Sequence, residues 1–505
     1  MMFLNFTAET ILLIASVLLF ASVLVTKMGA RFGVPALLLF LGVGMAGGVD
    51  GFGIEFNNAA VAQFIGMMAL SVILFSGGMD TRFEEIKPVL APGIILATLG
   101  VLLTSLITGL FIYFIAGQFQ QFIKLSLTES FLLASVMSST DSASVFSILR
   151  SKGLNLKHRL RPLLELESGS NDPMAYMLTI FFISMIQMNE VSLFSSVVEF
   201  ILQLGIGLVA GYFLGLLTTV VINRINMDQN SLYPILLFAC VFFIFSITDK
   251  IHGNGYLAVY IAGLVVGNKR ILHKKSISTF FDGFSRLWQI LIFLTLGLLV
   301  VPSDLLKPSV AGMGLLVGIF MILVARPLTV FLCYLPFRNV SLKARLYISW
   351  IGLRGAVPII FATYPFLAGI ENASLIFDVV FFITILSLIV QGTTVSSSAR
   401  LLGLSEEMTE DNNMFGIELP DEIKSSMSEI AVIPSLLEKG NRLMNIALPD
   451  NTLVVMIKRQ DKYFVPKGNT ILFEGDKLVL LSDNEEALQE TYRTLGITHY
   501  TIRRN

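Results

Sequence analysis

Residues 165–173 have the sequence Glu-Leu-Glu-Ser-Gly-Ser-Asn-Asp-Pro and lie within an apolar stretch that runs from Leu163 to Ile186. This stretch is long enough to cross a bilayer as one helix. With about 100° between successive residues, Ser168, Asn171 and Asp172 share one face of that helix. A hydroxyl, an amide and a carboxylate on one face form a hard set of oxygen ligands, which suits an alkali cation or a proton. The pattern therefore predicts a binding face inside a membrane.

The composition of the whole chain also indicates a membrane protein. Hydrophobic residues make up 54% of the 505 residues and charged residues 14%, whereas a soluble protein carries about 25% charged residues. The net charge of −1 argues against a nucleic-acid partner. The apolar residues gather in about thirteen stretches of membrane-spanning length. We expect these spans near residues 10–26, 34–48, 61–75, 89–115, 131–149, 163–186, 201–222, 233–248, 256–266, 287–301, 310–335, 346–366 and 375–390.

Lysine and arginine are distributed unevenly over the loops between these spans. Seventeen of them fall in one set of alternate loops, and three fall in the other set, namely Lys124, Lys250 and Lys307. Loops rich in lysine and arginine remain on the cytoplasmic side of a membrane. We therefore expect the N-terminus outside the cell and the C-terminus in the cytoplasm.

Two further spans have the composition of interrupted helices. Residues 138–144 read Ser-Ser-Thr-Asp-Ser-Ala-Ser, and residues 352–358 read Gly-Leu-Arg-Gly-Ala-Val-Pro. Hydroxyl groups can satisfy the backbone where a membrane helix breaks, although serines also favour close helix contacts. At about 1.5 Å per residue, Asp141, Asp172 and Arg354 lie about 12–13 Å from the cytoplasmic ends of their spans. The two interrupted spans are the fifth and the twelfth, seven apart in the order, and because seven is odd they would have opposite orientations. Together with charges at one depth, this indicates an inverted repeat around a site at the midplane of the membrane.

Glu167 and Arg354 are expected to form a structural ion pair. Glu167 lies at the edge of the polar face of its helix, next to Asn171. An arginine without a partner inside a membrane is costly, and Glu167 is the nearest candidate partner for Arg354. We therefore expect this pair to hold the helices together rather than to take part in exchange.

The C-terminal part of the chain has a different character. Residues 401–420 are polar and acidic and are expected to form a linker. Residues 421–497 contain the strand-like segments Leu453–Ile457 and Leu478–Leu481, turn-forming residues around them, and a helix expected over Glu485–Leu495. The predicted fold is thus an all-α polytopic membrane domain followed by a small cytoplasmic α+β domain.

The membrane motifs resemble those of the monovalent cation:proton antiporters, family 1, in the bacterial NhaP-like branch. The resemblance rests on Thr140-Asp141, on Glu167-Ser168-x-x-Asn171-Asp172 and on Gly352-Leu353-Arg354-Gly355-Ala356. It covers residues 1–400, which would form the exchanger domain in a bacterial inner membrane. Residues 421–497 resemble the C-terminal regulatory subdomain of TrkA-type potassium-uptake regulators, a combination similar to that of potassium/proton antiporters.

The resemblance implies an electroneutral exchange of K⁺ for H⁺ by alternating access, in which cation and proton compete for Asp172. It also implies a homodimer, in which each protomer has a dimerisation domain and a moving core. Residue 142 is serine where family members often have proline, so the geometry of this interruption stays open. The implied residues are Thr140, Asp141, Ser168, Asn171 and Asp172 around the proton or alkali cation, with Asp141 and Asp172 as its charged ligands, and Glu167 with Arg354 as the ion pair.

Three alternatives stand beside this interpretation. The same fold would serve a Na⁺/H⁺ or mixed antiporter, because oxygen ligands do not choose between the two ions. A ligand-gated K⁺ channel would need a carbonyl filter such as Thr-Val-Gly-Tyr-Gly, and no such run occurs. An intramembrane enzyme would use Asp141 and Asp172 as an acid pair, but the sequence supplies no nucleophile motif or metal ligands beside them.

We therefore expect a transporter that is not an enzyme and that needs no cofactor. Its expected partners are K⁺ or Na⁺, protons and membrane lipid. The cytoplasmic domain is expected to regulate transport, either through a bound small molecule or nucleotide or through dimer contacts alone. Cys240 and Cys333 lie in apolar stretches and are expected to be free thiols.

Overall fold

The computed structural model of the chain divides into two compact units, Met1–Thr409 and Glu410–Asn505. Each unit is described by itself. The residues that the structure describes are 7–32, 35–118, 124–187, 193–337, 340–407, 426–432, 434–437, 440–446, 448, 452–460 and 462–482.

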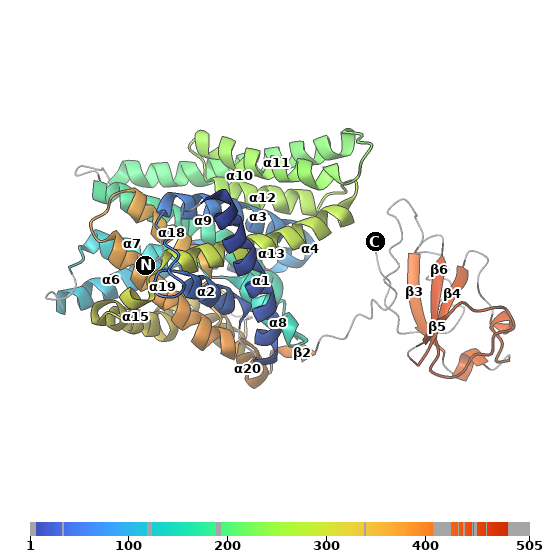
Figure 1. Cartoon of the computed structure of the whole chain (residues 1–505). Coiled ribbons are helices and arrows are strands. Elements are labelled where there is room, and N and C mark those ends of the chain that lie inside the picture. Colours follow the sequence, from blue (N-terminus) through green and yellow to red (C-terminus); the bar gives the residue numbers. More distant parts are fainter. Residues whose placement is uncertain are drawn as a thin grey trace. The chain divides into compact units, whose positions relative to one another are not determined.

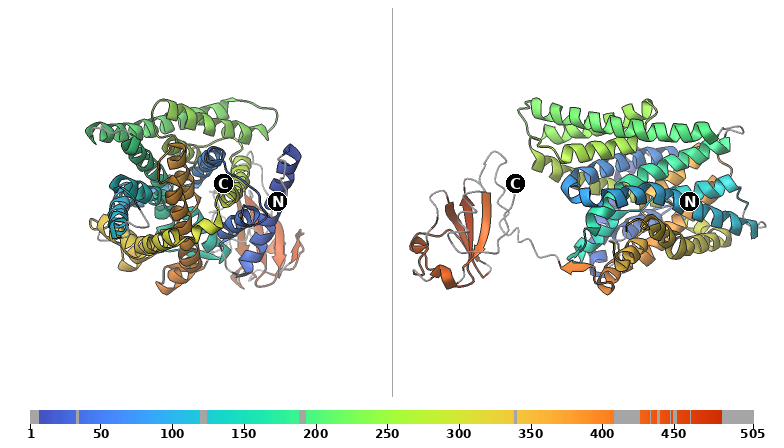
Figure 2. Two further views of the ribbon diagram at one scale, coloured as in Figure 1. Left: turned by 60° about the vertical axis from the view of Figure 1, so that its left-hand side comes forward. Right: turned by 180° about the vertical axis from the view of Figure 1, so that it is seen from behind.

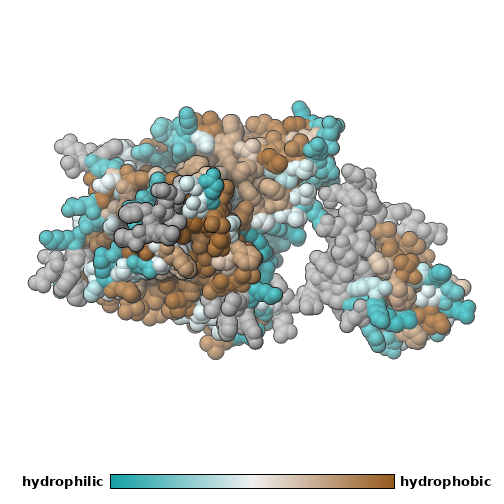
Figure 3. Space-filling model, viewed as in Figure 1, coloured by the Kyte–Doolittle hydropathy of each residue, from teal (hydrophilic) through white to brown (hydrophobic). Residues whose placement is uncertain are grey.

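The first unit is helical, and much of its surface is apolar. In the described chain, eight helical segments are long and apolar enough to cross a membrane, and four further apolar helices are shorter. Figure 3 shows apolar side chains across the middle of the visible face of this unit, with hydrophilic side chains gathered towards its two ends. The long segments are α1 (Ala8–Phe32), α3 (Ala59–Asp80), Phe83–Gln118, α10 (Leu193–Arg224), α11 (Leu232–Lys250), α13 (Lys274–Leu299), Pro308–Cys333 and Ala373–Leu401; the shorter helices are α2 (Ala36–Gly47), α7 (Leu127–Val136), α12 (Gly255–Gly267) and α18 (Ala356–Leu367).

Three of the long segments each contain one π-helical turn. Such turns are rare in proteins and often occur at functional sites. The first segment consists of α4 (Phe83–Ile86), η1 (Lys87–Val89), α5 (Leu90–Ile95), the π turn η2 (Leu96–Gly100) and α6 (Val101–Gln118); the second of α15 (Pro308–Phe320), the π turn η3 (Met321–Ala325) and α16 (Arg326–Cys333); the third of α19 (Ala373–Ser387), the π turn η4 (Leu388–Gly392) and α20 (Thr393–Leu401).

The helices of this unit pack into two bundles (Figures 1 and 2). The first bundle contains α1–α3 and α10–α13. The second contains α5–α9 and α15–α20, among them α8 (Ser142–Ser151), α9 (Leu160–Gln187) and α17 (Leu342–Trp350). The first bundle has an apolar core of its own, built by α3 and α10–α13. In α10, Gly207, Gly211 and Gly215 lie directly against the α12 backbone, so the two helices approach closely. The bundles meet where α3, α12 and α13 contact α9 (Leu160–Gln187) and α18.

Both predicted interruptions are present. Helix α7 ends at Val136, and α8 (Ser142–Ser151) begins in the same span after the five intervening residues 137–141. Helix α17 (Leu342–Trp350) ends before Gly352, and α18 begins at Ala356. Side chains rather than lipid surround the extended residues between them, because Ser138, Ser139 and Thr140 are buried. Irregular backbone at membrane depth is tolerated only in such protein-enclosed places.

A short antiparallel pair closes one end of the membrane unit. Strand β1 (Leu154–Leu156) pairs with β2 (Ser405–Glu407), and the Lys157 N–H donates to the Leu404 carbonyl at 2.9 Å. The first residues of the predicted linker 401–420 therefore belong to the membrane unit. The rest of that linker, from residue 408 on, lies outside the described residues.

The second unit contains a four-stranded antiparallel sheet with the order β3-β6-β4-β5. The two strand-like segments of the sequence correspond to β4 (Thr452–Arg459) and β6 (Lys477–Ser482), and β3 (Ser426–Ala431) and β5 (Lys462–Phe464) complete the sheet. Short helical turns η5 (Pro434–Leu437) and η6 (Leu443–Asn445) lie between β3 and β4. The helix predicted over Glu485–Leu495 lies outside the described residues.

A buried carboxylate joins the ends of the two central strands, β4 and β6. Asp476 accepts two hydrogen bonds from Arg459, at 2.9 and 2.8 Å, and one from the Phe473 N–H at 2.9 Å. Burial alone would raise the pKa of Asp476, but these three donors outweigh it and lower the pKa below 3.8. The carboxylate therefore stays charged at neutral pH.

Candidate cation-binding site

The two interrupted helices cross at the predicted site. The Asp141 N–H donates to the Leu353 carbonyl at 2.8 Å, which joins the extended residues of one interruption to those of the other. Gly355 lies so close to the Asp141 carboxylate that a Cβ at position 355 would collide with it. Position 355 therefore needs glycine for this crossing to form.

Helix α9 presents its polar face to the same crossing. The Ser168 hydroxyl donates to the Thr140 carbonyl at 2.8 Å and accepts from the Ser142 N–H at 3.1 Å. The Asn171 amide donates to the Thr140 hydroxyl at 2.6 Å. The Ser139 hydroxyl donates to the carboxylate of Asp172. The structure thus brings all the predicted ligand residues together: Thr140, Asp141, Ser168, Asn171 and Asp172.

The two aspartates differ in how far their oxygens are already occupied. Asp141 caps the N-terminus of α8: one oxygen accepts from the Ser144 N–H at 3.0 Å, and the other accepts from the Ser144 hydroxyl. A carboxylate is favoured at a helix N-terminus, where free N–H groups converge. Asp172 is 6% exposed, and within the described chain Ser139 is its one hydrogen-bond donor. Asp172 therefore has more free acceptor capacity than Asp141.

The predicted partner of Glu167 is wrong. Glu167 pairs with Arg326 at 2.5 Å, and the two side chains are 2% and 5% exposed. Arg354 instead makes two other contacts. Its guanidinium donates to the Ser139 carbonyl, and its backbone N–H donates to the Ser387 hydroxyl. Depth along the membrane favours Arg354 as the partner, but depth does not say which neighbouring helix lies beside Glu167.

Several residues that lie at the site or support it are not among the residues that the sequence predicts. Arg326 is a charge inside the apolar stretch 310–335, and this signal alone should have marked it. Ser139 lies in the serine-rich run 138–144, which predicts an interruption but does not mark Ser139 as a donor to Asp172. Ser387 and Gln391 are polar residues in the last span, both 1% exposed. Their roles have no local sequence signal, because they contact residues far away in the chain.

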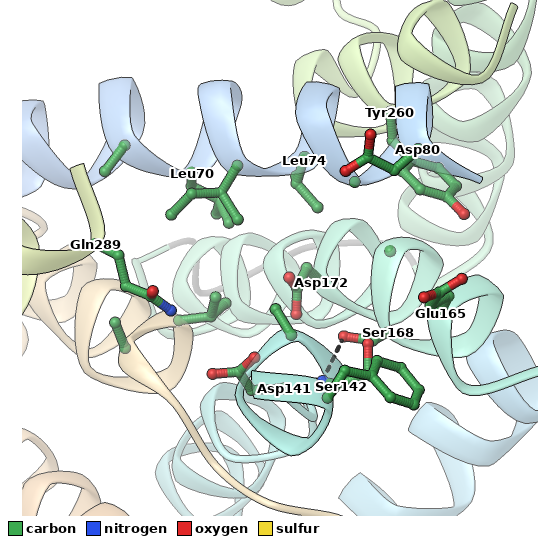
Figure 4. Close-up of a pocket in the computed structure, with 18 of the residues that line it drawn as sticks. Leu70, Leu74, Asp80, Asp141, Ser142, Glu165, Ser168, Asp172, Tyr260 and Gln289 are labelled. Atoms are coloured by element: carbon green, nitrogen blue, oxygen red, sulfur yellow. Dashed lines mark hydrogen bonds between the residues drawn. The ribbon is translucent and has the colours of Figure 1, made fainter. Parts of the chain in front are cut away.

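A cavity of about 630 Å³ leads to the site. Asp141, Ser168 and Asp172 line it from the second bundle, and Figure 4 shows Leu70 and Leu74 of α3 across from them. Charged residues from α3, α4, α8, α9 and α13 also line it, namely Asp80, Arg82, Glu85, Arg150, Arg161, Glu165 and Asp282. These charges include residues at the ends of α3, α8 and α9 that share one end of the unit. The site is therefore connected to that end.

On the other side of Asp172 the two bundles are packed together by tyrosines. Tyr176, one turn further along α9, makes edge-on contacts with Tyr256 of α12 and Tyr364 of α18, with ring centroids 5.0 and 5.5 Å apart. The hydroxyl oxygens of Tyr256 and Tyr364 are 3.4 Å apart. The amide of Asn254, the residue that caps the N-terminus of α12, donates to the Pro173 carbonyl of α9 at 2.9 Å. We refer to Tyr176, Tyr256 and Tyr364 as the tyrosine cluster.

Comparison with known proteins agrees with this arrangement. Residues 15–400 match the family described as sodium/hydrogen exchanger, transmembrane. The K(+)/H(+) antiporter NhaP2 of Shewanella sp. (strain MR-4) is 37% identical over 499 residues, which cover 95% of this chain and 83% of that protein. The Na(+)/H(+) antiporter NhaH of Halobacillus aidingensis is 32% identical over 325 residues, which cover 61% of this chain and 76% of that protein.

The fold is also similar to a solved structure. The sodium proton antiporter MjNhaP1 from Methanocaldococcus jannaschii superimposes with a TM-score of 0.64 and 24% identity, over 76% of this chain and 99% of that one. The match confirms the mostly helical multi-pass membrane fold, and the matched family is one of transporters rather than enzymes. On the strength of the family match over residues 15–400 and the 37% identity over nearly the whole chain, this protein belongs to the sodium/hydrogen exchanger family.

Proposed function

We propose that the protein exchanges K⁺ for H⁺, one for one, through competition at Asp172. The observation that carries this proposal is the buried Asp172 carboxylate at the cavity, beside two interrupted helices, with free capacity for a ligand. One carboxylate holds a proton or a dehydrated cation, but holding both is unfavourable because their charges repel. Competition couples the two fluxes as long as the site opens to one side at a time.

The choice of K⁺ over Na⁺ is supported by the relatives. The Shewanella protein, which is named as a K(+)/H(+) antiporter, aligns with 95% of this chain, including the second unit. The Halobacillus protein, which is named as a Na(+)/H(+) antiporter, aligns with 61%. The oxygen ligands at the site suit either ion. Na⁺/H⁺ or mixed exchange is therefore the second candidate, and the Halobacillus relative is the observation that favours it.

We also propose the topology that the sequence predicts. The eight long segments, the four short apolar helices and α9 would make thirteen spans. The cavity is lined by Arg82, Arg150 and Arg161, which belong to the loops rich in basic residues. Since such loops stay in the cytoplasm, we place the cavity opening and the C-terminus on the cytoplasmic side of the inner membrane, with the N-terminus outside. Interrupted spans five and twelve would be equivalent members of an inverted repeat.

The assembly and the second unit complete the proposal. We propose a homodimer, and we propose that the sheet unit is a TrkA-C-like regulatory domain. Its antiparallel four-stranded sheet and the strands foreseen from sequence support an α+β module. A small molecule or nucleotide bound there would control exchange.

Ion-dependent proton movement tests this function. The purified protein is placed in liposomes that contain a pH-sensitive dye, and K⁺, Na⁺, Li⁺ or choline is added outside. We expect K⁺ to drive proton movement at the highest rate, and a voltage-sensitive dye to report no potential, because one charge is exchanged for one. Movement with Na⁺ but not K⁺ would support the second candidate, and conduction of K⁺ without proton movement would refute antiport.

The structure has its cavity on the side of Asp172 that we assign to the cytoplasm. In this conformation the tyrosine cluster is expected to block the path from Asp172 to the outside of the cell. It joins the first bundle, through Tyr256, to the second bundle, through Tyr176 and Tyr364. Access from outside requires these contacts between bundles to separate. A reducible thiol-reactive linker between Tyr256→Cys and Tyr364→Cys should therefore block exchange, and reduction should restore it.

This experiment has a matched control in the same cluster. The chain contains two cysteines, Cys240 and Cys333, which are replaced by alanine first. A linker between Tyr176→Cys and Tyr364→Cys joins two helices of the same bundle and should leave the rate equal to that of the unlinked form. Full exchange through a completely linked Tyr256→Cys/Tyr364→Cys protein would show that the barrier lies elsewhere.

A further inference from the structure

The interruption between α17 and α18 leaves backbone groups without helical partners. Unsatisfied backbone groups are strongly unfavourable at membrane depth, where no water can bond to them. Two of these groups bond to side chains of the last span. The Arg354 N–H donates to the Ser387 hydroxyl at 2.9 Å, and the Trp350 carbonyl accepts from the Gln391 amide at 2.6 Å. One neighbouring segment, Ala373–Leu401, therefore supplies hydrogen bonds to the backbone on both sides of the interruption.

Ser387 and Gln391 act as one unit. The Ser387 hydroxyl, which accepts from Arg354, donates its own proton to the Gln391 side-chain oxygen at 2.6 Å. The hydrogen bonds thus run in one direction from Arg354 through Ser387 to Gln391 and on to Trp350. Both side chains are 1% exposed, and the π turn η4 (Leu388–Gly392) begins between them. We name this pair the Ser387–Gln391 bracket.

The stretch that the bracket holds also holds the site. Its Leu353 carbonyl accepts from the Asp141 N–H, and its Arg354 guanidinium donates to the Ser139 carbonyl. Ser139 in turn donates to Asp172. A shift of residues 350–354 would therefore move Asp141 and loosen the donor on Asp172. Neither bracket residue is among the described residues that line the cavity, so any effect on exchange must pass through these contacts.

We propose that Ser387 and Gln391 are positioning residues for cation exchange, which set the place of Asp141 and Asp172 without touching the cation. This inference rests on the exchange function proposed above. It assigns to the last span a role in ligand geometry in addition to its role in packing.

Replacing Gln391 by methionine tests the proposal, because the volume is kept and both hydrogen bonds are lost. We expect a several-fold rise in the apparent KM for the cation and a shifted pH profile of exchange, with protein yield retained. Ser387→Ala should act alike, and Ser387→Thr, which keeps the hydroxyl, should restore parental values. The double variant Ser387→Ala/Gln391→Met should be no worse than either single variant, because members of one network are not additive.

The control and a second measurement keep the test decisive. Ser398→Ala, further along the same span, loses a hydroxyl whose one hydrogen bond to the described part of the chain goes to the local Val395 carbonyl, and this variant should match the parent. Hydrogen–deuterium exchange of the full chain should show faster uptake at residues 138–144 and 350–356 in Gln391→Met. An unchanged KM and pH profile, or unchanged uptake at residues 138–144, would overturn the proposal. If the parent moves no protons with K⁺, Na⁺ or Li⁺, the proposed function fails, and the uptake measurement still decides whether the bracket holds the crossing.

Discussion

Asp172→Asn is expected to reduce cation-driven proton movement to the level of liposomes without protein. Asparagine keeps the shape of the side chain and its hydrogen bond with Ser139, but it can neither bind a proton nor balance the charge of a cation. The other two carboxylates of α9 already have a basic partner, because Glu167 pairs with Arg326 and Glu165 pairs with Arg161. The loss should therefore affect K⁺ and Na⁺ exchange equally.

Two comparisons sharpen this prediction. Asp228→Asn removes a carboxylate from an exposed residue that does not line the cavity, and its exchange rate should equal that of the parent. Asp141→Asn keeps a side-chain oxygen that can cap α8, so the protein should fold and exchange should weaken without vanishing. Coupled exchange by the Asp172→Asn variant would contradict the proposed competition, and persistent K⁺ current without proton movement would favour a channel.

Glu167→Leu is expected to destabilise the membrane unit strongly. The change leaves the Arg326 guanidinium buried and without its carboxylate partner, and breaking a buried pair in this way costs about 3–5 kcal/mol. The protein should unfold at a lower temperature in detergent and accumulate poorly. Arg326→Met alone should behave in the same way, because it leaves the Glu167 carboxylate unpaired.

The double variant Glu167→Leu/Arg326→Met should recover most of the stability. Replacing both partners of a buried ion pair by apolar residues is often neutral or stabilising. The matched control is Glu167→Leu/Arg354→Met, which should be less stable than Glu167→Leu alone, since it removes a second buried contact while Arg326 stays unpaired. Rescue by Arg354→Met rather than by Arg326→Met, measured by thermal unfolding, would contradict the observed pairing.

The positions of the site residues could be predicted from the sequence, because the energetic cost of a polar side chain in lipid depends only on the span that carries it. A carboxylate at Asp172 and hydroxyls around Asp141 are unfavourable in lipid wherever the rest of the chain lies, so these residues stand out in the sequence alone. Helical periodicity then places Ser168, Asn171 and Asp172 on one face. The same reasoning should have selected Arg326, which is equally unfavourable in lipid.

The neighbours of each span were not predictable in this way. Periodicity gives the helix face on which a residue lies, and distance along the span gives its depth in the membrane. Neither of them tells which other helix packs against that face. The error over Glu167 has this origin, because Arg354 and Arg326 both belong to spans that reach the site. The bracket of Ser387 and Gln391 was missed for the same reason, since a buried serine and glutamine have many partners to choose from.

The amino-acid sequence alone determined that this is a membrane protein with two interrupted helices and a polar face carrying Asp172, because the energetic cost of polar groups in lipid is local to each span. Tertiary structure alone decided that Glu167 pairs with Arg326 and that Ser387 and Gln391 bond to the backbone of the second interruption. It also decided that the cavity lies on one side of Asp172 while tyrosines pack the two bundles together on the other. These features depend on lateral packing between helices that are distant in the chain, and packing is a property of pairs of surfaces rather than of any one segment.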